Sequence, residues 1–264
     1  MIVIHPERPL AKNVLCFTTT RYNGASSGQF GSLNLASHVG DNQQKVEHNR
    51  AQLLSFLEKS DFALNSSSSI IKASAYTSNM HPLHYLPQNH SIEVVHYNLG
   101  GDFPPQCDAI YATEARTPLA VLTADCLPIM ITHIEGFEVA AIHAGYAGLT
   151  DGIIEKTINK MNVINSDLSV WIGPGICEKH FEISDDILYR FAPFNQHVRF
   201  NEKTDKFHVD LKAIATDILQ SLGVKQIQVS KQCSYCSDDL FSYRQATHKG
   251  LNECGRMASV IMHL

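Results

Sequence analysis

The sequence predicts a single α+β domain spanning residues 1–264, with mixed β-sheets packed in the core and helices outside. Short apolar runs rich in β-branched residues, which are typical of strands, recur along the whole chain. Segments with helical spacing of apolar residues lie among them, without the strict alternation that favours a parallel α/β sheet. No internal repeat and no linker divides the chain, whose 264 residues are 44% hydrophobic and can therefore form a substantial core.

The first strand is expected at residues 13–21, because NVLCFTTTR combines apolar and β-branched side chains. A loop rich in Gly, Ser and Asn follows at 22–42, and loops of this length are usually functional or disordered. The ordered character of FGSLNLASHVGD favours function. From 43 to 59 the apolar residues recur at helical spacing, with Asp41 or Asn42 as a suitable N-cap.

Beyond this helix, strands and helices are interspersed up to the C-terminus. Further strands are expected at 69–80, 91–98, 108–113, 118–131, 137–148, 168–177 and 227–236. Further helices are expected at 151–161, 184–191 and 207–223, the last ending at a glycine as helices commonly do. A run of small and apolar residues at 255–264 closes the chain.

Composition narrows the range of partners. The net charge of -5 gives no basic surface that would indicate nucleic acid. No apolar run approaches the ~20 residues needed to cross a bilayer, and the N-terminus lacks the basic start and long apolar centre of a signal peptide. We therefore expect a cytoplasmic protein without nucleic-acid or membrane partners. Its seven cysteines should be reduced, with metal binding or catalysis as the notable exceptions.

Two neighbouring apolar runs carry the first candidate site. Residues 118–131 and 137–148 each have the features of a buried strand, and they carry Cys126 and His143 respectively. On paired strands, this thiol and imidazole would lie close enough for a metal site or a Cys–His catalytic pair. The alternative is a buried small hydrophobe and a hydrogen-bonded core histidine. Pro128 should interrupt the ladder, so that the strand ends there or lies at an edge.

Two further groups of residues invite both a functional and a structural interpretation. Cys233 and Cys236 form a C-x-x-C pair, which fits half a zinc ribbon, a redox pair or two ordinary buried thiols. Arg244 and Arg256 lie in polar, loop-like surroundings. They are candidates for binding an anionic group such as phosphate, or for pairing with nearby carboxylates at the surface.

Several blocks of the sequence resemble one family in the correct order. TADCLPIMI and AAIHAGYAGL are similar to the T-A-D-C-L-P and H-A-G-W-R-G signatures of the YfiH-type laccase-domain family, also named the multicopper polyphenol oxidase or purine nucleoside phosphorylase family. The N-terminal segment, DAIYAT, IGPGICEKHFEI and CSYCSDDLFSYRQATHKGLNECGRMAS resemble its remaining blocks. The likeness covers nearly the whole chain and implies a YfiH-like fold, related in general form to cytotoxic necrotizing factor.

The resemblance implies a mononuclear zinc site formed by two histidines and one cysteine. Cys126 and His143 match the cysteine and one histidine. The other histidine belongs to a Q-x-H-G-x-x-V block, and our alignment of that block puts Tyr76 at the ligand position. Because a phenol is a poor ligand at neutral pH, His81 or His84 is the expected substitute.

The resemblance also implies an activity. Family activities are phosphorolysis of adenosine and inosine, adenosine deamination and, in an older attribution, copper-dependent phenol oxidation. We expect a zinc-dependent enzyme acting on a purine nucleoside and phosphate; a Cys/His set also suits Cu(I), which makes copper the second choice. The residues expected to contact substrate or phosphate are Arg21, Asn34, Arg50 and Arg244.

The H-A-G-W-R-G block departs from the family pattern, since Tyr146 and Ala147 replace its tryptophan and arginine. This leaves two alternatives open. One is a metal-independent hydrolase like the cytotoxic-necrotizing-factor deamidases, with Cys126 as nucleophile and His143 as base. The other is a non-catalytic relative whose pocket binds a small molecule.

Overall fold

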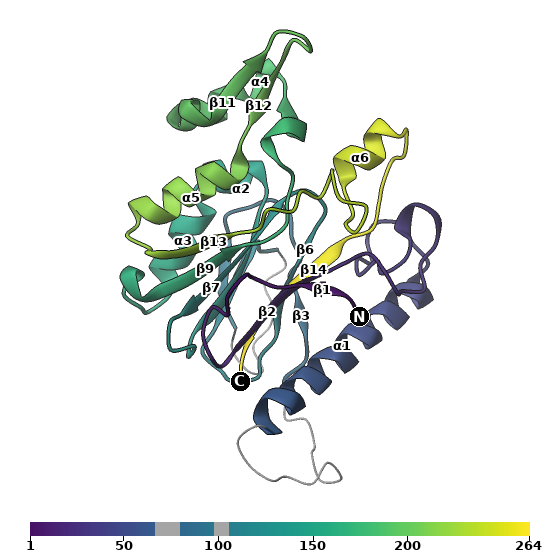
Figure 1. The fold of residues 1–264 in the computed structure, drawn as a ribbon, viewed down its shortest axis with the longest axis vertical. Coiled ribbons are helices and arrows are strands. Elements are labelled where there is room, and N and C mark those ends of the chain that lie inside the picture. Colours follow the sequence, from purple (N-terminus) through teal and green to yellow (C-terminus); the bar gives the residue numbers. More distant parts are fainter. Residues whose placement is uncertain (67–79, 98–105) are drawn as a thin grey trace.

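The computed structural model describes residues 1–66, 80–97 and 106–264. Two large mixed β-sheets form the centre of the molecule, and helices lie outside them (Figure 1). The predicted α+β class is therefore confirmed. The strand expected at 69–80, which includes Tyr76, lies outside the described residues except for Met80.

The strands form three sheets. The six-stranded sheet has the order β13 (Gln226–Val229), β9 (Leu168–Ile172), β7 (Leu127–His133), β8 (Val139–Ala144), β5 (Ala109–Ala112), β4 (Val94–His96). The five-stranded sheet has the order β1 (Val3–Ile4), β2 (Val14–Thr19), β14 (Met257–His263), β6 (Leu119–Thr123), β3 (His84–Tyr85). A smaller sheet joins β10 (Glu182–Ile183), β12 (Lys206–Val209) and β11 (Val198–Asn201).

The helices are mostly short. The α-helices are α1 (Gln43–Ser66), α2 (Tyr146–Thr150), α3 (Ile153–Lys160), α4 (Asp185–Leu188), α5 (Leu211–Ser221) and α6 (Tyr243–His248). The 3-10 turns are η1 (Gly28–Phe30), η3 (Asn165–Asp167), η4 (Glu178–His180) and η5 (Tyr189–His197). Among the helices that the structure describes, none has both the length and the apolar character to cross a membrane.

The two large sheets pack against each other through one shared apolar cluster. Val121 and Ile261 contribute from the five-stranded sheet, and Met130, Ala141 and Trp171 from the six-stranded one. Successive side chains of a strand point to opposite faces, so the neighbours of these residues face outward into further packing. Burial of both faces explains why the central strands are continuously apolar rather than alternating.

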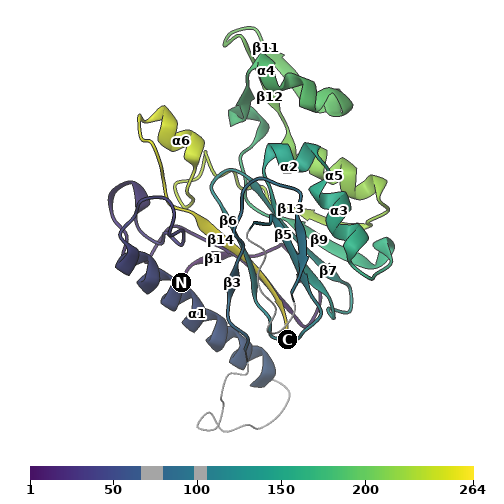
Figure 2. The same ribbon diagram turned by 180° about the vertical axis from the view of Figure 1, so that it is seen from behind.

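Helices cover the outer face of each sheet. On the six-stranded sheet, Ile129 and Ile142 pack with Ile154 of α3 and Ile214 of α5. On the five-stranded sheet, α1 supplies Leu53 and Leu57 to a separate cluster. The result is a four-layer arrangement, with α1 on one side and α3 and α5 on the other (Figures 1 and 2).

The run at 118–131 is not one strand, and this corrects the expectation for Cys126. The run divides into β6 and β7, which belong to different sheets, and Cys126 lies in the turn between them. Pro128 is the second residue of β7, a central strand, where its carbonyl accepts a hydrogen bond from Gly173 N–H at 2.8 Å. A proline is tolerated there because it stands at the very start of the strand.

Near the C-terminus, one expected helix is shorter than predicted, and the closing apolar run, for which no element was predicted, is a strand. The helix expected at 207–223 starts only at Leu211, because residues up to Val209 pair as β12 and Asp210 caps the helix by accepting from Ala213 N–H at 3.0 Å. The apolar run at 255–264 becomes β14, which lies at the centre of the five-stranded sheet. Strand β14 pairs antiparallel with both β2 and β6 and so joins the chain's end to its beginning.

Candidate metal centre and active-site pocket

The turn between β6 and β7 presents Cys126 in a constrained conformation. Asp125, immediately before it, has φ +98°, a left-handed value that non-glycine residues rarely adopt. The Asp125 carboxylate accepts hydrogen bonds from Ser234 Oγ at 2.6 Å and from the Arg244 backbone N–H at 2.7 Å. Its carbonyl accepts from Ile176 N–H at 2.9 Å. Three contacts thus hold a turn that would otherwise relax, a pattern frequent at functional sites.

His143 lies at the end of β8, beside this turn, and a buried carboxylate orients its ring. Nδ1 of His143 donates to Asp108 Oδ1 at 2.7 Å, and its backbone N–H donates to the Asp108 carbonyl, also at 2.7 Å. Asp108 is fully buried. Because a carboxylate only accepts, Nδ1 must carry the proton and Nε2 is left as the nitrogen available for a ligand.

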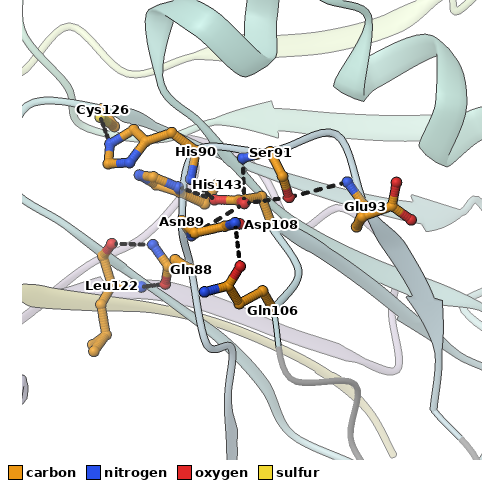
Figure 3. A network of polar contacts seen from close by, with 10 residues as sticks. All are labelled: Gln88, Asn89, His90, Ser91, Glu93, Gln106, Asp108, Leu122, Cys126 and His143. Atoms are coloured by element: carbon orange, nitrogen blue, oxygen red, sulfur yellow. Dashed lines mark hydrogen bonds and ion pairs between the residues drawn. The ribbon is translucent and has the colours of Figure 1, made fainter.

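The same carboxylate anchors the loop that carries His90. Asp108 accepts from the backbone N–H groups of Asn89, His90 and Ser91 at 3.2, 3.0 and 2.7 Å, and from Ser91 Oγ at 2.8 Å (Figure 3). One buried acid therefore positions both the His143 ring and the His90 loop.

His90, Cys126 and His143 converge at one point. One ligand atom from each residue lies within 4.8 Å of the others, and His90 Nε2 is 3.8 Å from Cys126 Sγ. The two imidazole rings meet edge to face, with centroids 4.9 Å apart. Gly145 makes room for this approach, because a Cβ there would stand 2.6 Å from His90 Cδ2. Two imidazoles and one thiol, with a carboxylate behind one imidazole, match a catalytic zinc site with an open position.

Charge interactions within the group shift its ionisation. Burial alone would raise the pKa of Cys126, but His143 and His90 outweigh it and lower that pKa to about 6. Burial would lower the pKa of His143, but the Cys126 charge and the Asp108 hydrogen bond raise it to about 9. Burial also acts to raise the pKa of Asp108, yet hydrogen bonds from His143 and Ser91 lower it to about 2. The thiol is thus readily deprotonated, as a metal ligand or a nucleophile must be.

The group lies in the wall of a cavity of about 450 Å³, within the size range of small-molecule sites. Apolar and aromatic side chains form part of the lining, with a cluster of charged residues beside them. The lining residues are His38, Gln88, His90, Leu122, Ala124, Asp125, Cys126, His143, Tyr146, Ile176, Phe181, Tyr243, Arg244, Glu253 and Arg256.

Two arginines contribute positive charge to this pocket. Arg244 donates to the backbone carbonyls of His180 and Glu182 at 3.2 and 3.0 Å. Both acceptors are uncharged, so these contacts do not neutralise the guanidinium. Arg256 is instead paired with Glu253 at 2.8 Å. Arg244 is therefore the stronger candidate for contact with an anionic substrate group.

The other residues expected to contact substrate do not line the cavity. Arg21 donates through Nε to the Gly31 carbonyl at 2.9 Å, and Arg50 donates through Nε to the Leu35 carbonyl at the same distance. Asn34 is fully buried. All three belong to the packing of the N-terminal loop rather than to the pocket.

The structure brings a different histidine to Cys126 and His143 from the two that the sequence suggested. Neither His81 nor His84 belongs to the group, and the ring of His84 packs instead against Tyr97 with centroids 4.5 Å apart. His90 joins Cys126 and His143 there, and Tyr76 lies outside the described residues. The signal was present in the sequence: residues 88–94, QNHSIEV, fit Q-x-H-G-x-x-V with serine for glycine.

Gln88, the first residue of this block, fixes the loop to the five-stranded sheet. Its side-chain amide donates to the Leu122 carbonyl at 2.8 Å and accepts from the Leu122 N–H at 2.7 Å (Figure 3). The side chain thus pairs with β6 as a strand residue would. His90 is thereby held close to the end of β6, where the Cys126 turn begins.

Fold and site together define an α+β protein with a Cys/His group, able to hold a metal, in the wall of a small-molecule pocket. Residues 15–264 match the family described as multi-copper polyphenol oxidoreductase laccase, and the chain belongs to this family. A Haemophilus influenzae protein named purine nucleoside phosphorylase is 35% identical over 267 residues, with 99% of each chain covered. An Escherichia coli protein, purine nucleoside phosphorylase YfiH, is 32% identical over 98% of each chain.

Solved structures agree with this assignment. The crystal structure of a Neisseria meningitidis protein superposes with a TM-score of 0.82 at 32% identity, covering 99% of this chain and 98% of the other. YlmD from Geobacillus stearothermophilus superposes with a TM-score of 0.78 at 25% identity, with the same coverage.

Proposed function

We propose that this protein is a zinc-dependent purine nucleoside phosphorylase acting on adenosine and inosine. The observation that carries the proposal is the convergence of His90, Cys126 and His143 in the wall of a pocket that also holds Arg244. The names of the relatives at 32–35% identity support the same reaction class.

The donor set supports zinc as the metal. His90 Nε2, His143 Nε2 and Cys126 Sγ would hold it, with the Asp108 carboxylate behind His143. When bound there, zinc supplies a Lewis acid in the pocket wall. The thiol of Cys126, with its pKa lowered to about 6, would bind as thiolate at neutral pH.

The remaining residues would bind and orient the two substrates. Phosphorolysis forms a bond from a phosphate oxygen to the ribose C1′ while the bond from C1′ to the purine nitrogen breaks. Arg244 would hold the phosphate, and the rings of Tyr146 and Phe181 would pack against the purine. Fixing both reactants in one pocket removes much of the entropic barrier of a bimolecular reaction.

The test is turnover of adenosine and inosine by protein purified without chelator, with metals counted by mass spectrometry. The expected products are the free base and ribose 1-phosphate, formed only when phosphate is present. Cys126→Ser and His90→Gln should lose turnover and the zinc held by the His90, Cys126, His143 group, whereas His48→Gln, on the exposed surface of α1, should keep both.

Different results would redirect the assignment. Inosine formed from adenosine without phosphate would show deamination instead. Turnover that survives complete metal removal would favour the metal-independent Cys–His alternative. Absence of both zinc and turnover would refute the proposal.

A further inference from the structure

We propose that Cys177, His180, Cys233 and Cys236 form a second, structural zinc site that braces the wall of the pocket. Within the described part of the chain, these four residues form a second group whose ligand atoms all lie within 4.8 Å of one another. None of them belongs to the His90, Cys126, His143 group.

The topology of the six-stranded sheet brings the two halves of this group together. Strands β9 and β13 are parallel neighbours, with Ile172 paired to Val229 at their ends. Because their carboxyl ends meet at one edge, the segments that leave them run side by side. Gly175 and Cys233 continue the pairing as a parallel bridge beyond the strands.

Each of the two segments carries two ligands separated by two residues. Cys177 and His180 follow β9, and Cys233 and Cys236 follow β13. The spacing places both members of a pair on one side of a tight turn, as zinc sites built from two such pairs require. The C-x-x-C pair alone indicated half a site; the Cys177-x-x-His180 pair supplies the other half only after folding.

The distances within the group fit a shared tetrahedral ion. His180 Nδ1 is 3.3 Å from Cys177 Sγ and 3.3 Å from Cys236 Sγ. One ring nitrogen has either one proton or one lone pair, so it cannot satisfy both thiols by itself. Zn–S and Zn–N bonds of about 2.3 and 2.0 Å at a tetrahedral angle put such atoms about 3.5 Å apart, close to the observed separation.

The surroundings suit a site with three thiolates. The backbone N–H of Cys177 is directed at Cys233 Sγ, 3.3 Å away, and would support a negatively charged sulfur. Zn²⁺ with three thiolates and one neutral imidazole has a net charge of about −1. The ammonium of Lys212 lies close by and donates to the carbonyls of Ser230 and Gln232 at 2.7 and 2.8 Å, just before Cys233.

Four protein ligands leave no open position, which is the pattern of a structural rather than a catalytic zinc site. The group nevertheless contacts the pocket wall through two of its own segments. The His180 carbonyl accepts from Arg244, and Ser234, next to Cys233, donates to Asp125. An ion at this group would therefore fix the two segments that hold Arg244 and the Cys126 turn.

Zinc counting in single variants tests the proposal independently of the catalytic site. Purified without chelator, the wild-type chain should bind one more zinc than Cys236→Ser or His180→Gln. The Cys126→Ser variant should keep the zinc at this second group, which separates the two proposals. His248→Gln is the matched control, because His248 is exposed and hydrogen-bonded to Tyr235 beside the group without belonging to it.

Cobalt substitution reports the ligands directly. In the Cys126→Ser background, Co²⁺ should give a strong thiolate-to-cobalt charge-transfer band and the d–d bands of a tetrahedral site. Cys236 is exposed, so its replacement by serine should weaken the band without unfolding the chain. Zinc content unchanged in Cys236→Ser and His180→Gln would overturn the proposal, as would a disulfide among these cysteines in anaerobically purified protein.

Discussion

Asp108 and His143 are joined twice, once through the backbone and once through their side chains, at 2.7 Å in each case. The double contact ties the ring orientation of His143 to the pairing of β5 with β8. The Asp108 carboxylate also accepts hydrogen bonds from three backbone N–H groups of the His90 loop. A single buried carboxylate thus sets the relative positions of two of the three proposed metal ligands.

Asp108→Asn should therefore weaken zinc binding by about 10–100-fold, because the amide cannot accept all the hydrogen bonds that orient His143 and the His90 loop. Competition with a chromogenic chelator measures the affinity. Asp205→Asn, in an exposed turn, serves as the matched control and should bind zinc as the wild type does. Equal affinities in the two variants would contradict this role for Asp108.

Gly145→Ala should disrupt the group sterically. The added Cβ would stand 2.6 Å from His90 Cδ2 and 3.3 Å from Cys126 Sγ, so the His90 ring must move. We expect loss of zinc affinity and of turnover in a folded protein. Denaturant unfolding checks the cause: the destabilisation by Gly145→Ala should be smaller in a His90→Ala background, where the clashing ring is gone.

Asp125 combines an unfavourable backbone conformation with two side-chain hydrogen bonds. Asp125→Ala loses both bonds and keeps the strain of φ +98°, whereas Asp125→Gly loses the bonds but relieves the strain. The free energy of unfolding, measured with denaturant, should therefore be higher for Asp125→Gly than for Asp125→Ala by about 1 kcal/mol. Both should lose turnover, because the Cys126 turn is no longer held. Equal stability of the two variants would show that the turn relaxes.

The reactivity of Cys126 gives a pH-dependent prediction for chelator-treated protein. A pKa lowered to about 6 keeps the thiol ionised from about pH 6 upward, and the pKa of His143, raised to about 9, keeps the imidazolium beside it up to that pH. Alkylation of Cys126 by iodoacetamide, followed by peptide mass spectrometry, should rise through pH 6. His143→Gln should move that midpoint upward, and bound zinc should protect the thiol. If Cys126 alkylation in the protein with His143 intact had its midpoint near the ordinary thiol pKa, the lowering of the Cys126 pKa by His143 would be refuted.

The apolar runs and their periodicity were sufficient to predict the fold class, because the central strands are buried on both faces and stand out in the sequence. Cys126 and His143 were recognisable for a related reason: each interrupts an apolar run. The location of Cys126 in a turn between two sheets was not predictable, since its run continues unbroken from β6 into β7.

His90 and Asp108 were not predicted from the sequence, for two different reasons. His90 lies in a polar loop where many histidines occur by chance, and its block has serine in place of the expected glycine. Asp108 immediately precedes β5 and gains its role only through contacts with residues up to 35 positions away. The Cys177 and His180 pair is similar, because parallel pairing of β9 with β13 is what brings it to Cys233 and Cys236.

Arg244 is the residue through which the pocket should recognise phosphate. Arg244→Gln should raise the KM for phosphate at least about tenfold, because a charge-assisted hydrogen bond to an anion is worth about 1.5–3 kcal/mol. The KM for inosine should change much less, since inosine carries no anionic group and its purine would pack against the rings of Tyr146 and Phe181. Arg21→Gln and Arg50→Gln are informative controls, because both arginines donate to backbone carbonyls outside the cavity lining. An increase in the phosphate KM in Arg21→Gln or Arg50→Gln, but not in Arg244→Gln, would move the phosphate site away from this pocket.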